Sequence, residues 1–266
     1  MTVFQALVLG IVQGLAEFLP VSSSAHLALT PWLLGWQDPG LAFDVALHLG
    51  TLVALVWCFR REWIALARAA SSILRTRRVS TDDERRAAYI LIATVPAGVA
   101  GVLLGDVAER ALRAPPLIAL TLIVVGLVLW YADKAGSQSR GLTSMTVREA
   151  VLIGVAQAFS LVPGVSRSGS TISAGRAMGF DRQSAATFSF LLSFPITAAA
   201  AAFKVPEALQ EGITTPLVAG IVAAAVSSAL AITILLRYVS KHSYGVFAAY
   251  RVLAGLAVLA LWYARR

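Results

Sequence analysis

The chain has 266 residues, of which 58% are hydrophobic and only 14% are charged, and its mean hydropathy is +0.77. Several uncharged stretches approach the roughly twenty residues that cross a bilayer, so the composition excludes an ordinary soluble domain and predicts a polytopic membrane protein. The net charge of +8 does not indicate nucleic-acid binding, because the basic residues lie in short loops beside apolar stretches, where they set topology and contact anionic lipid.

The first half of the chain begins with two short apolar stretches that are separated by a polar break. Residues 2–34 are apolar up to Phe18, break at Pro20 and the three serines that follow, and then become apolar again. This pattern predicts a re-entrant helix pair. A basic stretch at 60–86 is expected to be a loop with an interfacial helix near 63–74. Full transmembrane spans are predicted at 41–59, 87–104 and 117–132.

The same pattern recurs in the second half. Residues 147–178 start apolar, break at Pro163 and Gly164, and continue as a densely polar segment. Gly10 and Gln13 before the first break correspond to Gly154 and Gln157 before the second. Three further spans are predicted at 185–203, 216–236 and 245–263. We therefore assign the first repeat to residues 1–133 and the second to residues 147–266, within a single membrane domain.

An odd number of crossings in each repeat places the second copy upside down relative to the first. The predicted fold is an all-α polytopic membrane protein with an inverted-topology repeat, each half having one re-entrant helix pair plus three transmembrane helices, six full spans in total. The two breaks then meet near the midplane. Most basic residues fall on one side, which the positive-inside rule makes cytoplasmic, so both termini are expected to face outward. The other side receives only Arg110, Arg113, Lys204, Arg265 and Arg266.

The second break carries an arginine at membrane depth. Arg167 costs roughly 2.5–3.5 kcal/mol there on insertion scales, so it needs a water-filled cavity, a protein partner or an anionic ligand. A helix is predicted to begin near Ser166, with backbone N–H groups and hydroxyls facing the gap, an arrangement that binds phosphate. The glycine spacing is like that of a P-loop, but Ser170 stands where the lysine would be and no strand precedes it.

The first break carries a carboxylate and a histidine. Gln13 and Glu17 are one helical turn apart on the same face. Glu17 is predicted to be either a ligand for a hard cation or a partner for Arg167, with a helix-fastening polar residue as the structural alternative. His26 is either a buried histidine whose ring nitrogens are hydrogen-bonded within the protein, or a catalytic residue that acts as phosphoryl nucleophile or proton donor. His48, inside a span, is either a second-sphere residue or a buried one.

Together the two breaks supply what cleavage of a phosphoanhydride requires, namely charge neutralisation and an activated nucleophile. The predicted catalytic residues are Glu17, Ser23, His26 and Arg167, with the choice between Ser23 and His26 as nucleophile left open. Glu17, and more weakly Gln13, are predicted to bind a divalent cation. The predicted contacts of the diphosphate are Ser22, Ser24, Gly164, Ser166, Arg167, Ser168 and Thr171.

Two of these stretches resemble the signature motifs of the bacterial undecaprenyl-diphosphatase, or bacitracin-resistance, family. The stretch from Gln13 to His26 is similar to its Glu/Gln-x-x-x-Glu motif, and the stretch from Pro163 to Thr171 is similar to its Pro-Gly-x-Ser-Arg-Ser-x-x-Thr motif. The resemblance covers essentially the whole chain. It implies a plasma-membrane enzyme that hydrolyses undecaprenyl diphosphate to undecaprenyl phosphate and inorganic phosphate, recycles the lipid carrier of cell-wall synthesis and confers tolerance to bacitracin.

The resemblance also implies a Mg²⁺ or Ca²⁺ cofactor and an active site open to the outer face. Gln13 stands where many members carry glutamate, which removes a charge from the metal site, and Ser24-Ala25 replaces a Thr-Gly pair. The rival function is a lipid flippase or transporter, since broken helices in inverted repeats are transporter architecture. A structural scaffold is a third alternative, which leaves Arg167 and Glu17 unexplained. The expected partners are the lipid diphosphate and membrane lipid but no nucleic acid, and exposed apolar faces are compatible with a homodimer.

Overall fold

A computed structural model describes residues 1–137, 139–208 and 212–265, with no account of the side chains at 106–111 and 204–208. Of the basic residues that predict the topology, Arg110, Lys204 and Arg266 lie outside the described side chains. Within the described residues the chain is helical, and its only β-structure is an isolated bridge between Arg140 and Phe180. The all-α prediction is confirmed.

The helices of the first half follow the predicted order of a short pair and then longer helices. Their bounds are α1 Val3–Phe18, α2 Ser23–Leu34, α3 Leu41–Cys58, α4 Arg60–Thr76, α5 Asp82–Ala111 and α6 Pro115–Ala135. The second half repeats this order after a short 3-10 turn, η1, at Leu142–Ser144. Its bounds are α7 Val147–Ala158, the 3-10 turn η2 Phe159–Leu161, α8 Arg167–Ala177, α9 Arg182–Ala208, α10 Thr215–Val239 and α11 Gly245–Ala264.

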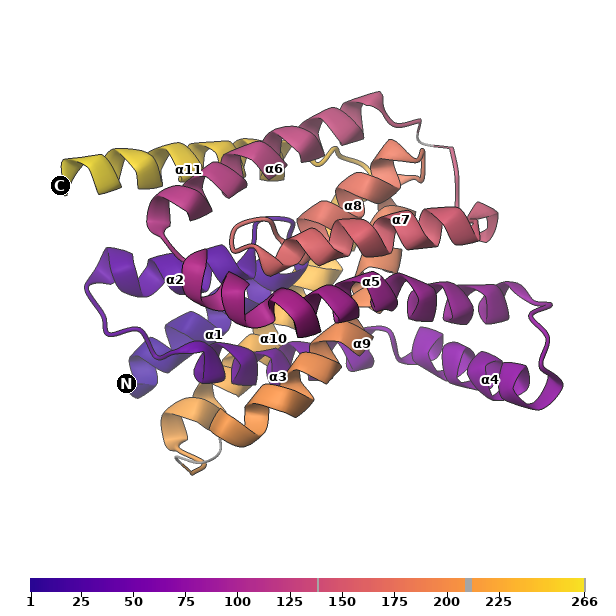
Figure 1. Ribbon diagram of the computed structural model, residues 1–266, viewed down its shortest axis with the longest axis horizontal. Helices are drawn as coiled ribbons and strands as arrows, with labels where there is room; N and C mark the ends of the chain where they lie inside the picture. The colour runs from indigo at the N-terminus through magenta and orange to yellow at the C-terminus, as the bar shows by residue number, and fades with distance from the viewer. Residues whose placement is uncertain (138, 209–211, 266) are drawn as a thin grey trace.

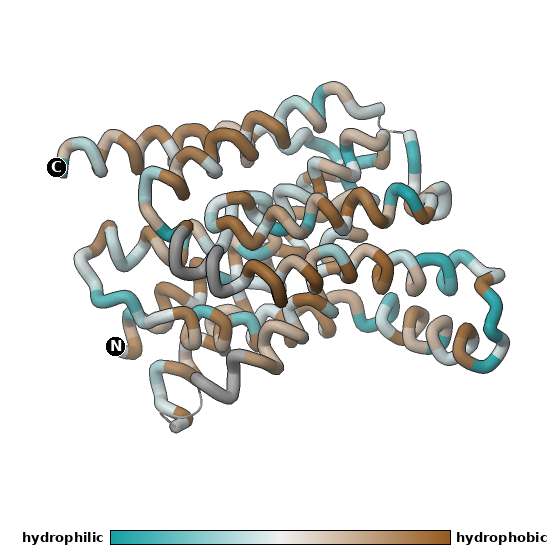
Figure 2. Tube along the Cα trace, in the orientation of Figure 1, coloured by the Kyte–Doolittle hydropathy of each residue, from teal (hydrophilic) through white to brown (hydrophobic). Residues whose placement is uncertain are grey.

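Among the described residues, 6 helices are long and apolar enough to cross a membrane. They are α3, α5, α6, α9, α10 and α11, and they confirm the six predicted spans. Figure 2 shows that hydrophobic residues dominate these helices and that hydrophilic residues gather at their ends and in the connecting loops. The chain is therefore a multi-pass membrane protein.

The basic stretch between the first two spans is mostly helical rather than a loop. The helix α4 covers Arg60–Thr76, and α5 begins at Asp82, earlier than the predicted start of its span. The reason is a capping box, in which Thr81 accepts from the backbone of Glu84 and the Glu84 side chain accepts from the backbone of Thr81. This local signal extends the helix beyond its apolar part.

The two short pairs enter the bundle from opposite ends (Figure 1). The pair α1–α2 starts and finishes at the end that holds both termini, and the pair α7–α8 starts and finishes at the opposite end, the end at which α4 also lies. This is the arrangement expected of an inverted repeat. The depth of each pair in a bilayer, and the exact boundaries of the repeats, stay predictions.

Glycines let the first helix of each pair approach a spanning helix closely. A Cβ on Gly10 of α1 would lie 2.3 Å from the Gly220 carbonyl oxygen of α10, and a Cβ on Gly154 of α7 would lie 2.4 Å from the Ala93 carbonyl oxygen of α5. Because no side chain fits at either contact, a glycine packed against a backbone carbonyl oxygen fixes each pair against the bundle. It thereby places the two breaks in its interior.

The end of the bundle opposite the termini is held by a buried ion-pair cluster. Asp133 of α6 accepts hydrogen bonds from Arg176 Nε of α8 and Arg182 Nε of α9, each at 2.8 Å, and from the backbone N–H of Tyr244 at 3.0 Å. Arg176 is fully buried. The cluster joins the ends of α6 and α8 to the starts of α9 and α11.

Candidate active site

The two helix breaks have the same local backbone conformation. Ser22 precedes α2 with φ 79°, and Ser166 precedes α8 with φ 72°. Each serine caps its helix, since the Ser22 hydroxyl accepts from Ala25 N–H at 3.4 Å and the Ser166 hydroxyl accepts from Gly169 N–H at 3.0 Å. A positive φ in a residue other than glycine costs about 1–3 kcal/mol and persists only where the surroundings enforce it. Both breaks are therefore strained in the same way.

Glu17, at the end of α1, is the centre of the site. Its side chain is only 8% exposed. Arg167 Nη2 donates to its carboxylate at 2.9 Å, the Ser23 hydroxyl at 2.6 Å and the Gln13 amide at 3.1 Å. His48 Nε2 lies 3.6 Å from the same carboxylate. Residues from both breaks thus meet at one carboxylate. Of the two functional roles predicted for Glu17, ligand of a hard cation or partner of Arg167, the structure shows the contact with Arg167.

Arg167 is also hydrogen-bonded to α9. Its Nη1 donates to the Ser189 carbonyl oxygen at 2.9 Å. The Thr171 hydroxyl donates to the Arg167 carbonyl oxygen at 2.8 Å and lies 2.7 Å from the Ser189 hydroxyl. A guanidinium has further N–H donors. Arg167 is also the first residue of α8, and backbone N–H groups at a helix N-terminus favour an anion. Sequence reasoning missed Ser189, because one serine in an apolar span carries no distinguishing signal.

His26 stands apart from this cluster. Its Nδ1 lies 2.7 Å from the Ser22 carbonyl oxygen, and its Nε2 lies 2.7 Å from the Tyr250 hydroxyl of α11, whose ring stacks on the imidazole. Because a carbonyl only accepts, Nδ1 carries the proton and Nε2 accepts from Tyr250. Both ring nitrogens are engaged, so the nucleophile prediction favours Ser23, which donates directly to Glu17.

The other predicted diphosphate contacts make hydrogen bonds within the protein. Ser168 donates to the Glu17 carbonyl oxygen at 3.3 Å and so ties α8 to the end of α1. The hydroxyls of Ser22 and Ser24 lie 3.2 Å apart, as do those of Ser166 and Ser168. Ser24 is exposed and marks where the site reaches the surface. Contact of these residues and of Gly164 with a diphosphate stays a prediction.

The donor atoms around Glu17 suit a hard cation better than a transition metal. No group of three or more His, Cys, Asp or Glu residues that could hold a metal occurs among the residues described. Gln13 Oε1, however, is buried without a hydrogen-bond partner in the described part of the chain, one turn from Glu17. The Gln13 amide turns its Nε2 towards Glu17, so Oε1 joins the carboxylate and the Ser23 hydroxyl only when the amide turns over. The three oxygens are of the kind that Mg²⁺ takes, with its other ligands from water and phosphate.

Two residues of α11 that reach the breaks were also missed. Tyr250 contacts His26, and the adjacent Arg251 is fully buried and donates to backbone carbonyls of both breaks. A signal for Arg251 was present, because an arginine within an apolar span raises the same question that Arg167 raised. No pattern in the sequence connects α11 with the first break.

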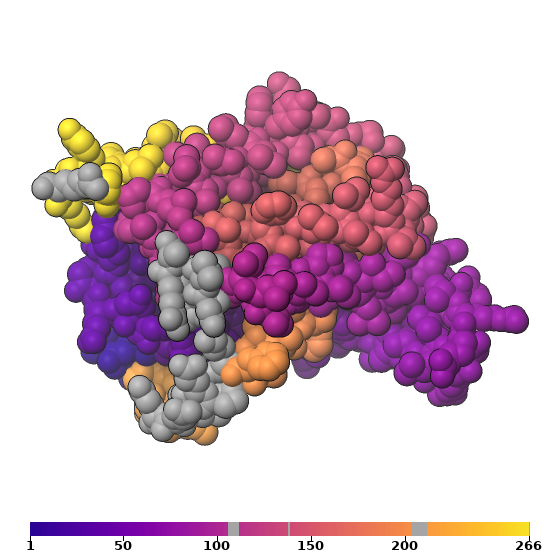
Figure 3. All heavy atoms as spheres, viewed as in Figure 1, coloured from indigo at the N-terminus to yellow at the C-terminus, as the bar shows by residue number. Residues whose placement is uncertain are grey.

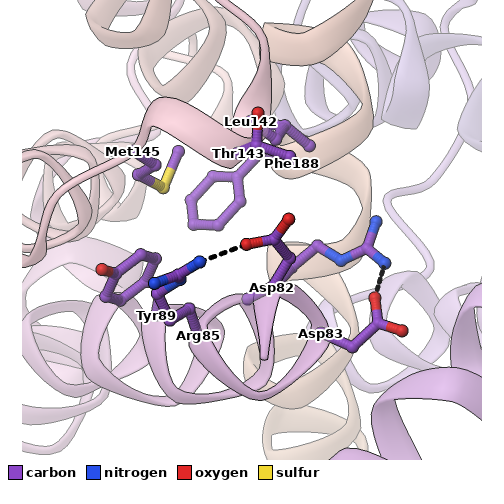
Figure 4. Close-up of a pocket in the computed structure, with 9 residues that line it drawn as sticks. Asp82, Asp83, Arg85, Tyr89, Leu142, Thr143, Met145 and Phe188 are labelled. Carbon is purple, nitrogen blue, oxygen red and sulfur yellow. Dashed lines mark hydrogen bonds and ion pairs between the residues drawn. The ribbon is translucent and has the colours of Figure 1, made fainter. Parts of the chain in front are cut away.

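Two cavities lie outside this cluster. A small one of about 140 Å³ lies between the start of α5, η1 and α9. Figure 4 shows Arg85 paired with Asp82. Arg86 pairs with Asp83, so the cavity offers little unpaired charge. A larger apolar groove of about 870 Å³ lies between α6, α7 and α8 and reaches Val165, next to the second break. Figure 3 shows α8 exposed between α6 and α7 along this groove.

Comparisons with known proteins show the family to which the chain is similar. A family model described as bacitracin resistance protein BacA matches residues 6–257. A protein of Gemmatimonas aurantiaca named undecaprenyl-diphosphatase is 59% identical over 261 residues, covering 98% of each chain. Proteins of the same name from Pelotomaculum thermopropionicum and Moorella thermoacetica are 48% and 46% identical over 266 residues, covering 100% of this chain and 99% and 100% of theirs.

Proposed function

The chain belongs to the bacitracin resistance protein BacA family, and from that membership we propose that it hydrolyses undecaprenyl diphosphate to undecaprenyl phosphate and inorganic phosphate. The observation that carries the proposal is the meeting of Glu17, Ser23 and Arg167 from two breaks inside a membrane protein. The apolar groove beside α8 suits a substrate that is part lipid. The names of the relatives favour hydrolysis over the flippase alternative.

In this proposal Arg167 binds the terminal phosphate, aided by the N-terminus of α8. Glu17 accepts the proton of the Ser23 hydroxyl, from which it already receives a hydrogen bond at 2.6 Å. The Ser23 oxygen forms a bond to the terminal phosphorus as the anhydride bond breaks, and undecaprenyl phosphate leaves with the electron pair. Water then attacks the phosphorus of the phosphoserine, and the Ser23 oxygen leaves with the electron pair and takes back the proton that Glu17 holds. Inorganic phosphate leaves with the hydroxyl and the remaining proton of the water.

A divalent cation, Mg²⁺ or Ca²⁺, is part of the proposal. Glu17, Gln13 Oε1 and the Ser23 hydroxyl would hold it. When bound, it supplies neutralisation of the negative charge on the diphosphate. His26 is proposed to transfer a proton near the exposed side of the site. Tyr250 and the Ser22 carbonyl oxygen fix the orientation of its ring.

We further propose that the protein lies in the bacterial plasma membrane with both termini and the site opening outside. The basic helix α4 lies at the end opposite the termini (Figure 1), in keeping with the positive-inside rule. A homodimer also stays a proposal.

The test is phosphate release by the detergent-purified protein from a long-chain prenyl diphosphate, with and without a chelator. We expect turnover that stops with the chelator and with Arg167→Ala. Absence of release by the intact protein, over a range of lipids and divalent metals, would refute the hydrolase function and favour the transporter alternative.

A further inference from the structure

Arg251 is the one side chain of α11 that bonds to both breaks, as far as the described residues extend. It is fully buried. Its Nη1 donates to the Pro20 carbonyl oxygen of the first break at 3.1 Å, and its Nη2 donates to the Gly164 and Val165 carbonyl oxygens of the second break at 2.7 and 3.2 Å. Its Nε donates to the Leu122 carbonyl oxygen of α6 at 3.3 Å. One planar group therefore joins four segments of the chain.

Three of the four carbonyls that Arg251 binds, those of Pro20, Gly164 and Val165, lie at the helix breaks, outside any helix. In an apolar interior such groups must find donors, because no water is available to them. They lie within two residues of Ser22 and Ser166, the two serines with positive φ. Arg251 thus stabilises the backbone at the two points where it is strained.

We propose that Arg251 is a positioning residue that sets the two breaks in register, so that Glu17 and Ser23 of one face Arg167 of the other. The inference rests on the proposed hydrolase function. Arg251 acts through the backbone, because its four described hydrogen bonds all go to carbonyl oxygens. Lysine cannot replace it, since only the planar fork of a guanidinium reaches carbonyls on several sides at once.

Gly169 in the second motif supports this role. A Cβ at Gly169 would lie 3.2 Å from Arg251 Nη1 and 3.0 Å from Ser166 Cβ, both closer than ordinary contact. The glycine therefore leaves room for the guanidinium beside the first turn of α8. This position of the second motif is therefore shaped by an arginine of another helix.

Arg176 offers a matched control within the same chain. Like Arg251 it is fully buried, but it lies in the ion-pair cluster with Asp133 and makes no described contact with either break. The same change to lysine at both positions therefore separates loss of a buried guanidinium in general from loss of the register between the breaks.

The experiment compares Arg251→Lys and Arg176→Lys with the wild type, using the full-length purified protein and release of phosphate from a long-chain prenyl diphosphate. Folding is checked by size-exclusion chromatography and thermal unfolding. Since a misplacement of about 1 Å costs on the order of 100-fold in rate, we expect Arg251→Lys to lower kcat by about 100-fold and to change KM by less than about threefold. Arg176→Lys is expected to lower Tm but to keep kcat within about threefold of wild type.

Several outcomes would overturn the inference. These are a kcat for Arg251→Lys near that of the wild type, equal losses of kcat in the two lysine variants, or a raised KM with an unchanged kcat. If Arg251→Lys does not fold, Gly169→Ala decides, because it presses on the guanidinium without removing it. It should lower kcat by about tenfold at unchanged KM, and an unchanged kcat refutes the inference. A wild type without activity refutes the hydrolase function instead.

Discussion

The two helix breaks share one backbone conformation but carry opposite chemistry. In each, a serine with positive φ caps the following helix and lies 3.2 Å from the hydroxyl of the serine two positions later. Between these serines the first break has Ser23 and the second has Arg167. The carboxylate, Glu17, belongs to the first break alone.

This difference shows how a repeated scaffold can build an asymmetric site. Each break alone is a capped helix start with free backbone N–H groups, which suits an anion. Only when the breaks face each other does the cation of one pair with the carboxylate of the other, at 2.9 Å. The conformation that the two breaks share thus supplies the geometry, and the residues that differ between them divide the chemistry.

The largest effect should come from removing the arginine side chain of the second break. Arg167→Ala removes the group that stabilises phosphate charge and leaves Glu17 without its arginine, so kcat/KM is expected to fall by about 10³-fold or more while the protein stays folded. Phosphate release measures this effect. Arg148→Ala, at an exposed arginine in the first turn of α7, is the control that should keep its activity. Near-normal turnover by Arg167→Ala would contradict the assignment.

The next effect concerns the carboxylate of the first break. Glu17→Gln removes the acceptor of the Ser23 proton and the charged ligand of the cation, so we expect kcat to fall by about 10²–10³-fold and the metal titration to weaken. Gln13→Glu is the complementary change. It adds a carboxylate where Gln13 Oε1 lacks a partner in the described chain, and it should lower the metal concentration that gives half-maximal activity. An unchanged metal titration in both variants would make Glu17 a structural residue.

Ser23 tests which group of the first break attacks. Ser23→Ala should lower kcat by about 10²-fold or more, because the hydroxyl that donates to Glu17 is lost. Ser80→Ala, at an exposed serine outside the site, should change kcat by less than about threefold. If Ser23→Ala remains active and His26→Ala does not, the attacking group is assigned to the wrong residue.

The smallest expected effect tests whether the two breaks are equivalent as scaffolds. Ser22→Ala and Ser166→Ala each remove a cap hydroxyl and keep the positive φ, so each should lower the free energy of unfolding by about 1 kcal/mol. Ser22→Gly and Ser166→Gly should cost less, because glycine adopts that conformation without strain. Thermal unfolding of the four variants measures this. Clearly different losses of unfolding free energy at the two breaks would mean that different contacts stabilise their shared conformation.

Much of the site could be predicted from the sequence because its strongest signals are local. Apolar length predicts the spans, a proline followed by hydroxyls predicts each break, and a charge at membrane depth demands a partner. Glu17 and Arg167 followed from these rules. Arg251 should have followed as well, since it too is a charge within an apolar span, but its partners are backbone carbonyls that no sequence pattern marks.

The sequence by itself determined the class of fold, the two breaks and the residues that carry charge into the membrane, because each depends on nearest neighbours and on the cost of burying polar groups. Tertiary structure alone decided which groups face each other. It paired Glu17 with Arg167 across 150 positions of chain and turned His26 towards Tyr250. It also placed Arg251 between the breaks. The physical reason is that such pairings depend on how helices distant in sequence pack, through close contacts such as Gly10 against Gly220.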